Sequence, residues 1–360
     1  LKIIEFIIFV IYGRKISKVQ SKSKYWKLSI IPILTFAIVE GLRFGRMVDW
    51  NLYYFRYQQL GVNMSYCDYE PLFEFICNFL YQIGVPYYGF IFLQCLFLAV
   101  SIFVLLGNFK SSCVWCVPLI LVCTTPNEMF IRWYLAFGFI LLSIHTFLNK
   151  KYVYTLIWLV CSSLCHSGVI VVALTVFILG CLKKYSLPSW ISVVLLFLTT
   201  FILTLSNVMF VSNIISYLSP FMGDWTLGSY IDNATSILDG TWGEVGIMER
   251  SLIKNIGAFI AYVPVAFLGK DIMSKYKYGL VFYNLFIIGA IGAPLFTVEI
   301  FNRFFSICLF FFCIVGGICY TQIFSHWKSH SRYIVLVTLA SLFFALIPHV
   351  WDAINRPVDM

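Results

Sequence analysis

The chain alternates between long apolar segments and short polar connections. A membrane-spanning α-helix needs ~20 predominantly apolar residues, because a rise of ~1.5 Å per residue must cover a hydrocarbon core of ~30 Å. Most of the apolar segments approach that length, and they are continuous, which favours helices over a β-barrel. The pattern predicts about 12 transmembrane helices. We expect them at residues 1–12, 28–43, 87–107, 113–127, 129–148, 152–166, 168–182, 187–210, 251–269, 278–297, 302–323 and 332–350.

Two segments depart from this pattern. Residues 71–84 form an apolar run that is short and interrupted by polar residues such as Glu74, so we expect a re-entrant or interfacial helix there. Residues 211–250 form the one long connection, which the alternation of helices places outside the cytoplasm. The predicted fold is therefore all-α and polytopic, with residues 1–360 in a single transmembrane domain.

The composition also indicates an integral membrane protein. Hydrophobic residues make up 61% of the chain and charged residues 11%, whereas a typical soluble domain has ~25% charged residues. Mean hydropathy is +0.89, and a soluble fold of this length could not bury so much apolar surface. Most of the 12 cysteines lie inside apolar runs, where cysteine packs as a small hydrophobic side chain. The pattern therefore favours neither a disulfide framework nor a metal site.

Lysine residues orient the predicted helices. The connection after the first apolar run contains Arg14, Lys15 and four further lysines without any acid, which is typical of a cytoplasmic loop. If the helices alternate from there, and residues 71–84 do not cross, the later basic connections also lie inside and both termini lie outside. These later connections contain Lys110, Lys150 with Lys151, Lys183 with Lys184, Lys270 with Lys275 and Lys277, and Lys328 with Arg332.

Arginine has the opposite distribution. In this topology 14 of the 16 lysines are cytoplasmic, but seven of the nine arginines lie outside, against the usual insertion bias. The guanidinium group is permanently charged and its planar fork of donors suits phosphate and carboxylate. We therefore predict an anion-binding site on the outer face, the alternative being ion pairs with Asp49, Asp68, Glu70, Glu74, Glu128 or Glu299. The outer arginines are Arg43, Arg46, Arg56, Arg132, Arg250, Arg303 and Arg356.

The first candidate stretch covers residues 40–49. If the preceding helix continues, Arg43 and Arg46 share one face and could clamp a diphosphate. Gly41 and Gly45 would permit the close approach of a neighbouring helix or of the phosphates. Asp49 follows in the same stretch and is a candidate to accept a proton.

Three further residues on the outer side are candidates. Arg132 opens an apolar run, where the helix dipole and free N–H groups also favour an anion; the alternative is that its side chain snorkels to the surface. Arg303 precedes another apolar run on the same side. His166 lies at a break between two short runs, where an ionisable group indicates a functional site. Neutral imidazole could accept a proton from a sugar hydroxyl, although a lone histidine is often structural.

The long outer connection combines acids with aromatic residues. Asp224 and Glu244 offer carboxylates that accept hydrogen bonds from hydroxyl groups, and Trp225 and Trp242 offer rings that stack on sugar C–H faces. This combination suits a glycan, whereas the alternative is a solvated loop whose tryptophans rest at the membrane interface. The chain contains no P-loop and no dinucleotide-binding motif. We expect no cofactor and no nucleic-acid partner, and a substrate that arrives in the membrane or from the outer compartment.

Four stretches in order along the chain resemble a known family. They are GLRFGRMVDWNLYY (41–54), RWYLAFGFILLSIHTFLNKK (132–151), SSLCHSGVIVV (162–172) and NRFF (302–305). Together they are similar to the EpsG-like family of bacterial polysaccharide polymerases, which is grouped with the Wzy-type O-antigen polymerases. Trp133 stands where the family usually has Gln or Asn, and Met47 and Val48 replace its usual Gly-Thr before Asp49.

The resemblance implies a metal-independent glycosyltransferase of the bacterial inner membrane with a periplasmic active face. Its substrate would be undecaprenyl-diphosphate-linked repeat units, which it would join into O-antigen or a related surface polysaccharide. In that reaction Arg43, Arg46, Arg132 and Arg303 would bind the diphosphate, and His166, or else Asp49, would be the base. Membrane lipid and a chain-length regulator protein are the partners implied.

Other functions fit part of the pattern. A flippase for the same lipid-linked units also needs about 12 helices and interior arginines, but its cationic groups should extend through a central cavity instead of gathering at one border. A glycan ligase would use similar chemistry with a different acceptor. A membrane acyltransferase would need a histidine with a carboxylate partner, which the sequence does not make obvious.

Overall fold

The computed structural model describes residues 1–42, 48–62, 69–124, 130–202, 252–295 and 299–355. Within these ranges every regular element is a helix, which confirms the predicted all-α class. The α-helices are α1 (Lys2–Ser17), α2 (Lys22–Gly41), α3 (Val48–Val62), α4 (Pro71–Gln82), α5 (Tyr87–Leu106), α6 (Cys113–Cys123), α7 (Ile131–Leu148), α8 (Tyr152–Cys165), α9 (Ile170–Cys181), α10 (Ser189–Phe197), α14 (Leu252–Met273), α15 (Gly279–Leu295), α16 (Glu299–Phe310), α17 (Phe312–Ser325) and α18 (Arg332–Asn355).

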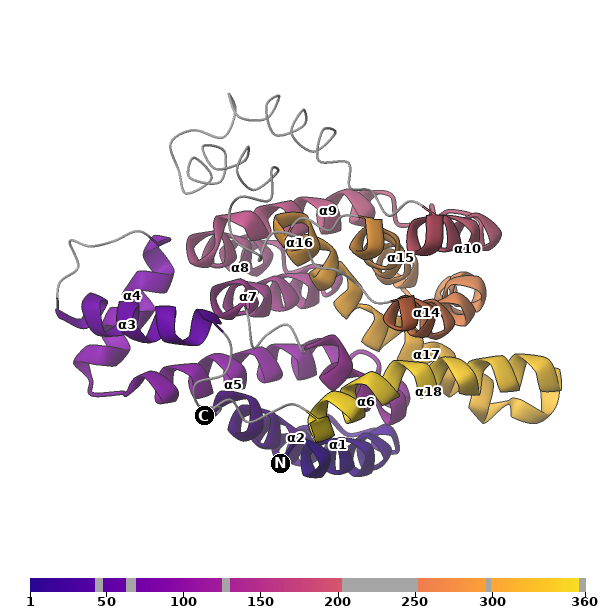
Figure 1. The fold of residues 1–360 in the computed structure, drawn as a ribbon, viewed down its shortest axis with the longest axis horizontal. Helices are drawn as coiled ribbons and strands as arrows, with labels where there is room; N and C mark the ends of the chain where they lie inside the picture. Colours follow the sequence, from indigo (N-terminus) through magenta and orange to yellow (C-terminus); the bar gives the residue numbers. More distant parts are fainter. Residues whose placement is uncertain (43–47, 63–68, 125–129, 203–251, 296–298, 356–360) are drawn as a thin grey trace, which may run out of the picture.

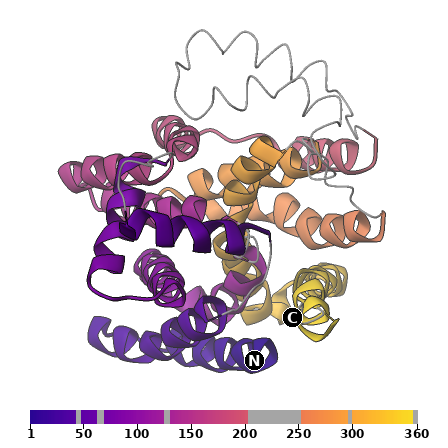
Figure 2. The ribbon, with the colours of Figure 1, turned by 60° about the vertical axis from the view of Figure 1, so that its left-hand side comes forward.

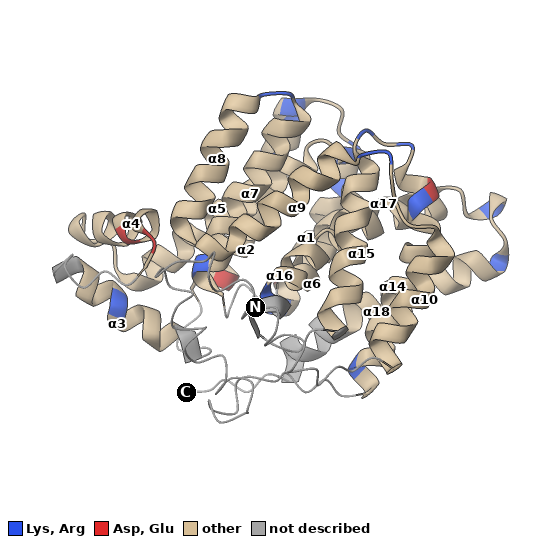
Figure 3. Cartoon of the chain, turned by 90° about the horizontal axis from the view of Figure 1, so that it is seen from above, with Lys and Arg blue, Asp and Glu red and all other residues tan. Residues whose placement is uncertain are grey.

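Length and hydropathy identify membrane-spanning segments among these helices. Four segments are long and apolar enough to cross a bilayer, namely Tyr87–Leu106, Ile131–Leu148, Leu252–Met273 and Arg303–Ser325. Several shorter apolar helices, including α8 and α9, accompany them. Most of the helical ribbon in Figure 3 carries no charged residue. The chain is therefore a membrane protein, and the predicted number of crossings exceeds the four segments that meet the length criterion.

The surface of α8 and α9 shows where lipid would lie. Val153 is 71% exposed, Leu156 63% and Leu174 55%, although all three side chains are aliphatic. Such a continuous apolar surface would be unfavourable in water and is expected against hydrocarbon.

Helices distant in sequence pack side by side in the bundle. α1 lies against α2 and α6, α2 lies against α5, and α7 lies between α5 and α8 (Figures 1 and 2). The buried Phe137 of α7 contacts Phe310 and Phe311 at edge-to-face angles, so α7 also joins the first half of the chain to the α16–α17 pair. The predicted run at 302–323 is confirmed as the apolar segment Arg303–Ser325, which the assignment divides into α16 and α17 at the single residue Phe311.

Contacts between connections show that the lysine-rich loops share one end of the bundle. Lys277 Nζ approaches the carbonyl oxygen of Leu148 at 3.4 Å, and Lys183 lies over the ring of Tyr278. At the same end Lys110 Nζ donates to the carbonyl oxygen of Gln20 at 3.1 Å. The loops that the sequence analysis placed on one side of the membrane are therefore neighbours in space.

The expected helix at 71–84 is α4, which pairs with α3 at the edge of the bundle (Figure 1). Pro71 occupies its first turn, where the missing N–H is harmless. Phe73 and Cys77 face the bundle, whereas Phe75 and Phe79 are exposed. The apolar but two-faced character of α4 is compatible with either a re-entrant or an interfacial position, and α4 is not among the apolar helices that approach spanning length.

Gly41, at the end of α2, permits a close contact with α5. A Cβ atom built on Gly41 would lie 2.6 Å from the Cα atom of Phe92, which is a backbone atom that cannot rotate away. This confirms the expected helix approach at Gly41, whereas Gly45 lies outside the described residues.

Replacing Gly41 with alanine should therefore separate α2 from α5. We expect a loss of about 1–3 kcal/mol, the range found for overpacked cores, seen as a lower midpoint of thermal unfolding in detergent. Gly257→Ala is the matched control, because a Cβ there would meet Phe344 at an ordinary 3.6 Å. Equal midpoints for the two variants would contradict this account of Gly41.

Candidate functional site

Three segments far apart in sequence meet at the end of the bundle opposite the lysine-rich loops. They are the residues before α4, the first turn of α7, and the junction between α8 and α9, where the chain is extended at His166 and then makes a 3₁₀ turn over Ser167–Val169. Each segment brings one polar or charged side chain to the meeting point. The side chains are those of Glu70, Arg132 and His166.

Glu70 is the centre of this cluster. Its Oε2 accepts a hydrogen bond from Arg132 Nη1 at 2.8 Å. Its Oε1 accepts from both the backbone N–H of Ser167 at 2.9 Å and the hydroxyl of Ser167 at 3.2 Å. Only 7% of the carboxylate side chain is exposed, so these charge-assisted bonds compensate its burial. One side chain therefore ties α4, α7 and the α8–α9 junction together.

Aromatic residues hold the other side of the Arg132 guanidinium. Its Nε donates to the hydroxyl of Tyr53 in α3 at 2.7 Å. Its Cζ atom lies over the ring of Tyr69, 4.0 Å from the ring centre, close enough for a cation–π interaction. Nε and Nη1 are thus engaged, whereas Nη2 has no hydrogen-bond partner among the described residues. Arg132 does not snorkel to the surface, and it can offer Nη2 to an anion.

The hydrogen bonds of His166 determine which of its nitrogens carries a proton. Its Nδ1 accepts from the backbone N–H of Gly168 at 3.1 Å. A backbone N–H can only donate, so neutral His166 has its proton on Nε2. Trp133 packs edge-to-face on the imidazole at 4.8 Å between ring centres, and Gly168 makes room, because a Cβ there would lie 2.7 Å from the Trp133 ring. His166 is therefore held as a donor through Nε2.

Burial and nearby charges set the protonation states at the junction. Burial lowers the pKa of His166; Glu70 opposes this effect, while Arg132 and Arg303 lower the pKa further. Burial would raise the pKa of Glu70, but His166, Arg132 and the Ser167 N–H lower it below its ordinary value. At neutral pH the cluster therefore contains a neutral imidazole and an ionised carboxylate paired with a guanidinium.

Arg303 adds a second cation at this end of the bundle. It lies in α16, and its guanidinium stacks 4.5 Å from the ring centre of Phe130, just before α7. Phe130 directly precedes α7 and lies two residues before Arg132, so Arg303 is close to the first turn of α7. Arg132, His166 and Arg303, which the sequence analysis selected separately, are thus neighbours.

The remaining candidates can be placed only in part. Asp49 lies in α3, four positions and about one helical turn before Tyr53, and its side chain is outside the described part of the structure. The other predicted diphosphate-binding and sugar-binding residues are also outside it. These are Arg43, Arg46, Asp224, Trp225, Trp242 and Glu244.

The roles of several residues could not be predicted from the sequence. Glu70 is predicted only as an ion-pair partner for an outer arginine, and that pairing is confirmed for Arg132. No role is predicted for Tyr53, Tyr69 or Ser167. The only sequence signal for Glu70 is its position directly before Pro71, which is typical of a residue at a helix start.

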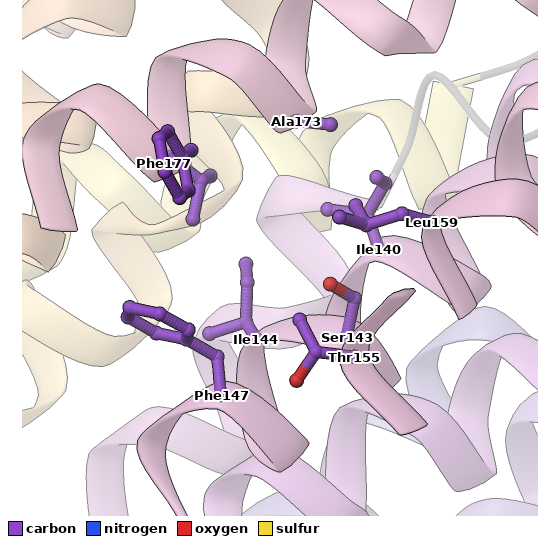
Figure 4. Close-up of a pocket in the computed structure, with 9 residues that line it drawn as sticks. Ile140, Ser143, Ile144, Phe147, Thr155, Leu159, Ala173 and Phe177 are labelled. Carbon is purple, nitrogen blue, oxygen red and sulfur yellow. The ribbon is translucent and has the colours of Figure 1, made fainter. Parts of the chain in front are cut away.

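Among the described residues, no three His, Cys, Asp or Glu side chains gather as metal ligands would. A small cavity of about 30 Å³ lies between α7, α8 and α9 near the lysine-rich end, lined mainly by apolar side chains with the hydroxyls of Ser143 and Thr155 (Figure 4). It is too small for a sugar and lies away from Arg132.

Comparison with known proteins gives one match. A model of the EpsG family matches residues 26–355, which is nearly the whole chain. No curated protein matches. No solved structure matches either.

Proposed function

Because the chain belongs to the EpsG family, a polysaccharide polymerase-like family, we propose that it joins undecaprenyl-diphosphate-linked repeat units into O-antigen or a related surface polysaccharide. The observation that carries the proposal is the convergence of Arg132, Arg303 and His166 at one end of a membrane bundle. Two fixed cations and an N–H donor are the groups that a diphosphate leaving group needs.

The proposal includes a topology. The lysine-rich end of the bundle lies in the cytoplasm by the positive-inside rule, so the Arg132 end faces the periplasm of a bacterial inner membrane. If the chain crosses twelve times, as the apolar runs predict, every lysine-rich connection lies on the cytoplasmic side. The connection at 211–250 would then be periplasmic, and we propose that its acids and tryptophans bind the glycan.

The reaction is a glycosyl transfer between two lipid-linked glycans. A hydroxyl oxygen of the incoming unit attacks the anomeric carbon of the growing chain, and the bond from that carbon to the diphosphate oxygen breaks. Undecaprenyl diphosphate leaves with the electron pair, and a base takes the proton of the hydroxyl. Arg132 Nη2, Arg303 and His166 Nε2–H would stabilise the negative charge that grows on the diphosphate, which lowers the barrier because that charge is largest in the transition state.

The hydrogen bond from Gly168 changes the order of the two candidate bases. In neutral His166 the lone pair of Nδ1 already accepts that bond, so the ring is better suited to donate through Nε2 than to take a proton. Asp49 becomes the first candidate, because α3 brings residue 49 within about one turn of Tyr53, the partner of Arg132. No metal is needed in this scheme, since guanidinium groups supply the positive charge.

Deletion of the gene in the source strain tests the proposal. We expect surface polysaccharide on a gel to collapse from a ladder to lipid core bearing a single repeat, because flipping and ligation still work. Complete loss of repeats would favour a flippase or ligase instead. An unchanged ladder of altered mass would favour an acyltransferase.

A further inference from the structure

Glu70 has a role that neither diphosphate binding nor proton transfer requires. Its carboxylate is buried beside groups proposed to bind an anion, where another negative charge would weaken diphosphate binding. Yet both of its oxygens accept hydrogen bonds, Oε2 from Arg132 and Oε1 from Ser167. The unfavourable effect of this carboxylate on diphosphate binding must therefore be offset by the way its contacts position the neighbouring groups.

The contacts fix the orientation of Arg132. Glu70 binds Nη1 from one side and Tyr53 binds Nε from the other, while the ring of Tyr69 covers one face. Two in-plane partners and one stacking partner restrict the rotation of the guanidinium plane. The donor that remains is Nη2, and its direction is determined by the two bonds that flank it.

The same carboxylate fixes the position of His166. It binds the backbone N–H of Ser167, the next residue along the chain, and its Oε1 lies 3.7 Å from His166 Nδ1. His166 is extended there and begins the turn toward α9. A change at Glu70 would therefore move the His166 ring relative to Arg132.

We propose that Glu70 is a positioning residue, which holds Arg132 Nη2 and His166 Nε2 at the spacing at which both bind phosphate oxygens of one lipid-linked donor. This inference rests on the proposed function. Near-isosteric Glu70→Gln removes the charge and turns one acceptor into an N–H₂ group facing either Arg132 or Ser167, both of which are donors. Small misplacements of catalytic groups can slow reactions by about 100-fold.

The test measures polymer formation in membranes of the deletion strain that contain equal amounts of each variant and the accumulated single-repeat lipid-linked donor. We expect Glu70→Gln to slow polymerisation at least about tenfold and Glu70→Asp, which keeps the charge, to be intermediate. The matched control is Glu74→Gln. Glu74 is also a buried glutamate, in the first turn of α4, and its Oε1 accepts a hydrogen bond from the backbone N–H of Tyr69. Glu74→Gln should stay within about twofold.

A double-mutant cycle separates positioning from a general effect on folding. If Glu70 orients the planar fork of Arg132, then Glu70→Gln should cost less in the Arg132→Lys background than in the wild type, and the part that remains is its effect through His166. An equal loss in both backgrounds, or wild-type polymerisation by Glu70→Gln, would overturn the inference. If instead Arg132→Ala itself polymerised normally, the proposed function would fail, which is a different result.

Discussion

Replacing Arg132 with alanine should abolish long surface polysaccharide and leave single repeats on the lipid core. Loss of one preorganised donor to a developing anion typically slows a reaction by about 10²–10³-fold, and chain length depends on many successive transfers. Arg132→Lys keeps the charge but loses the fork that engages Tyr53 and Glu70 together, so we expect short chains from that variant. The measurement is complementation of the deletion strain, with ladders compared at equal protein levels.

The control for Arg132 must share its residue type and helix position. Arg332 meets both conditions, since it opens α18 and is exposed at the lysine-rich end. Arg332→Ala should give a normal ladder. Because loss of Arg132 leaves the buried Glu70 carboxylate unpaired, which can destabilise a protein by about 3–5 kcal/mol, Arg132→Ala with Glu70→Gln is the second variant. A full ladder from either Arg132→Ala protein would refute the role of Arg132.

The sequence predicted the components of the site better than their arrangement. The helices follow from apolar run length, and the side of each loop follows from lysine, because both are local or additive properties of the chain. Arg132, His166 and Arg303 could be selected since each is polar at the border of an apolar run. The run at 302–323 could be predicted from its apolar length as well, and it corresponds to the segment Arg303–Ser325.

The role of Glu70 could not be predicted in the same way. Its bonds join residues 62 and 97 positions apart, and a hydropathy pattern contains no information about which helix ends meet. Trp133 also has a role in the fold that the pattern did not indicate. Its ring packs on His166 over the space left by Gly168, a contact that only the close approach of α7 to the α8–α9 junction creates.

Variants of His166 should show whether its side chain acts as a hydrogen-bond donor or as a general base. Asparagine can still accept the Gly168 N–H through Oδ1 but has no group at the position of Nε2, so His166→Asn should keep the fold and lose about 100-fold in polymerisation. Glutamine can place an amide N–H near that position, so His166→Gln should retain activity within about tenfold. Neither amide can accept a proton, so a base would be equally lost in both variants.

The pH dependence of polymerisation gives an independent test of the same assignment. The ordinary pKa of histidine is about 6.5, and burial lowers that of His166, with Arg132 and Arg303 adding to the effect and Glu70 opposing it. The neutral donor form therefore persists as pH falls through 6.5, and we expect the rate in membranes to stay level between about pH 8 and pH 6. A fall in rate below pH 6 that disappears in His166→Gln would restore the histidine as the base, because an imidazole with a lowered pKa loses its accepting form only there. A level profile together with active His166→Gln leaves the proton to a carboxylate, and Asp49→Asn is then the variant that should lose polymer.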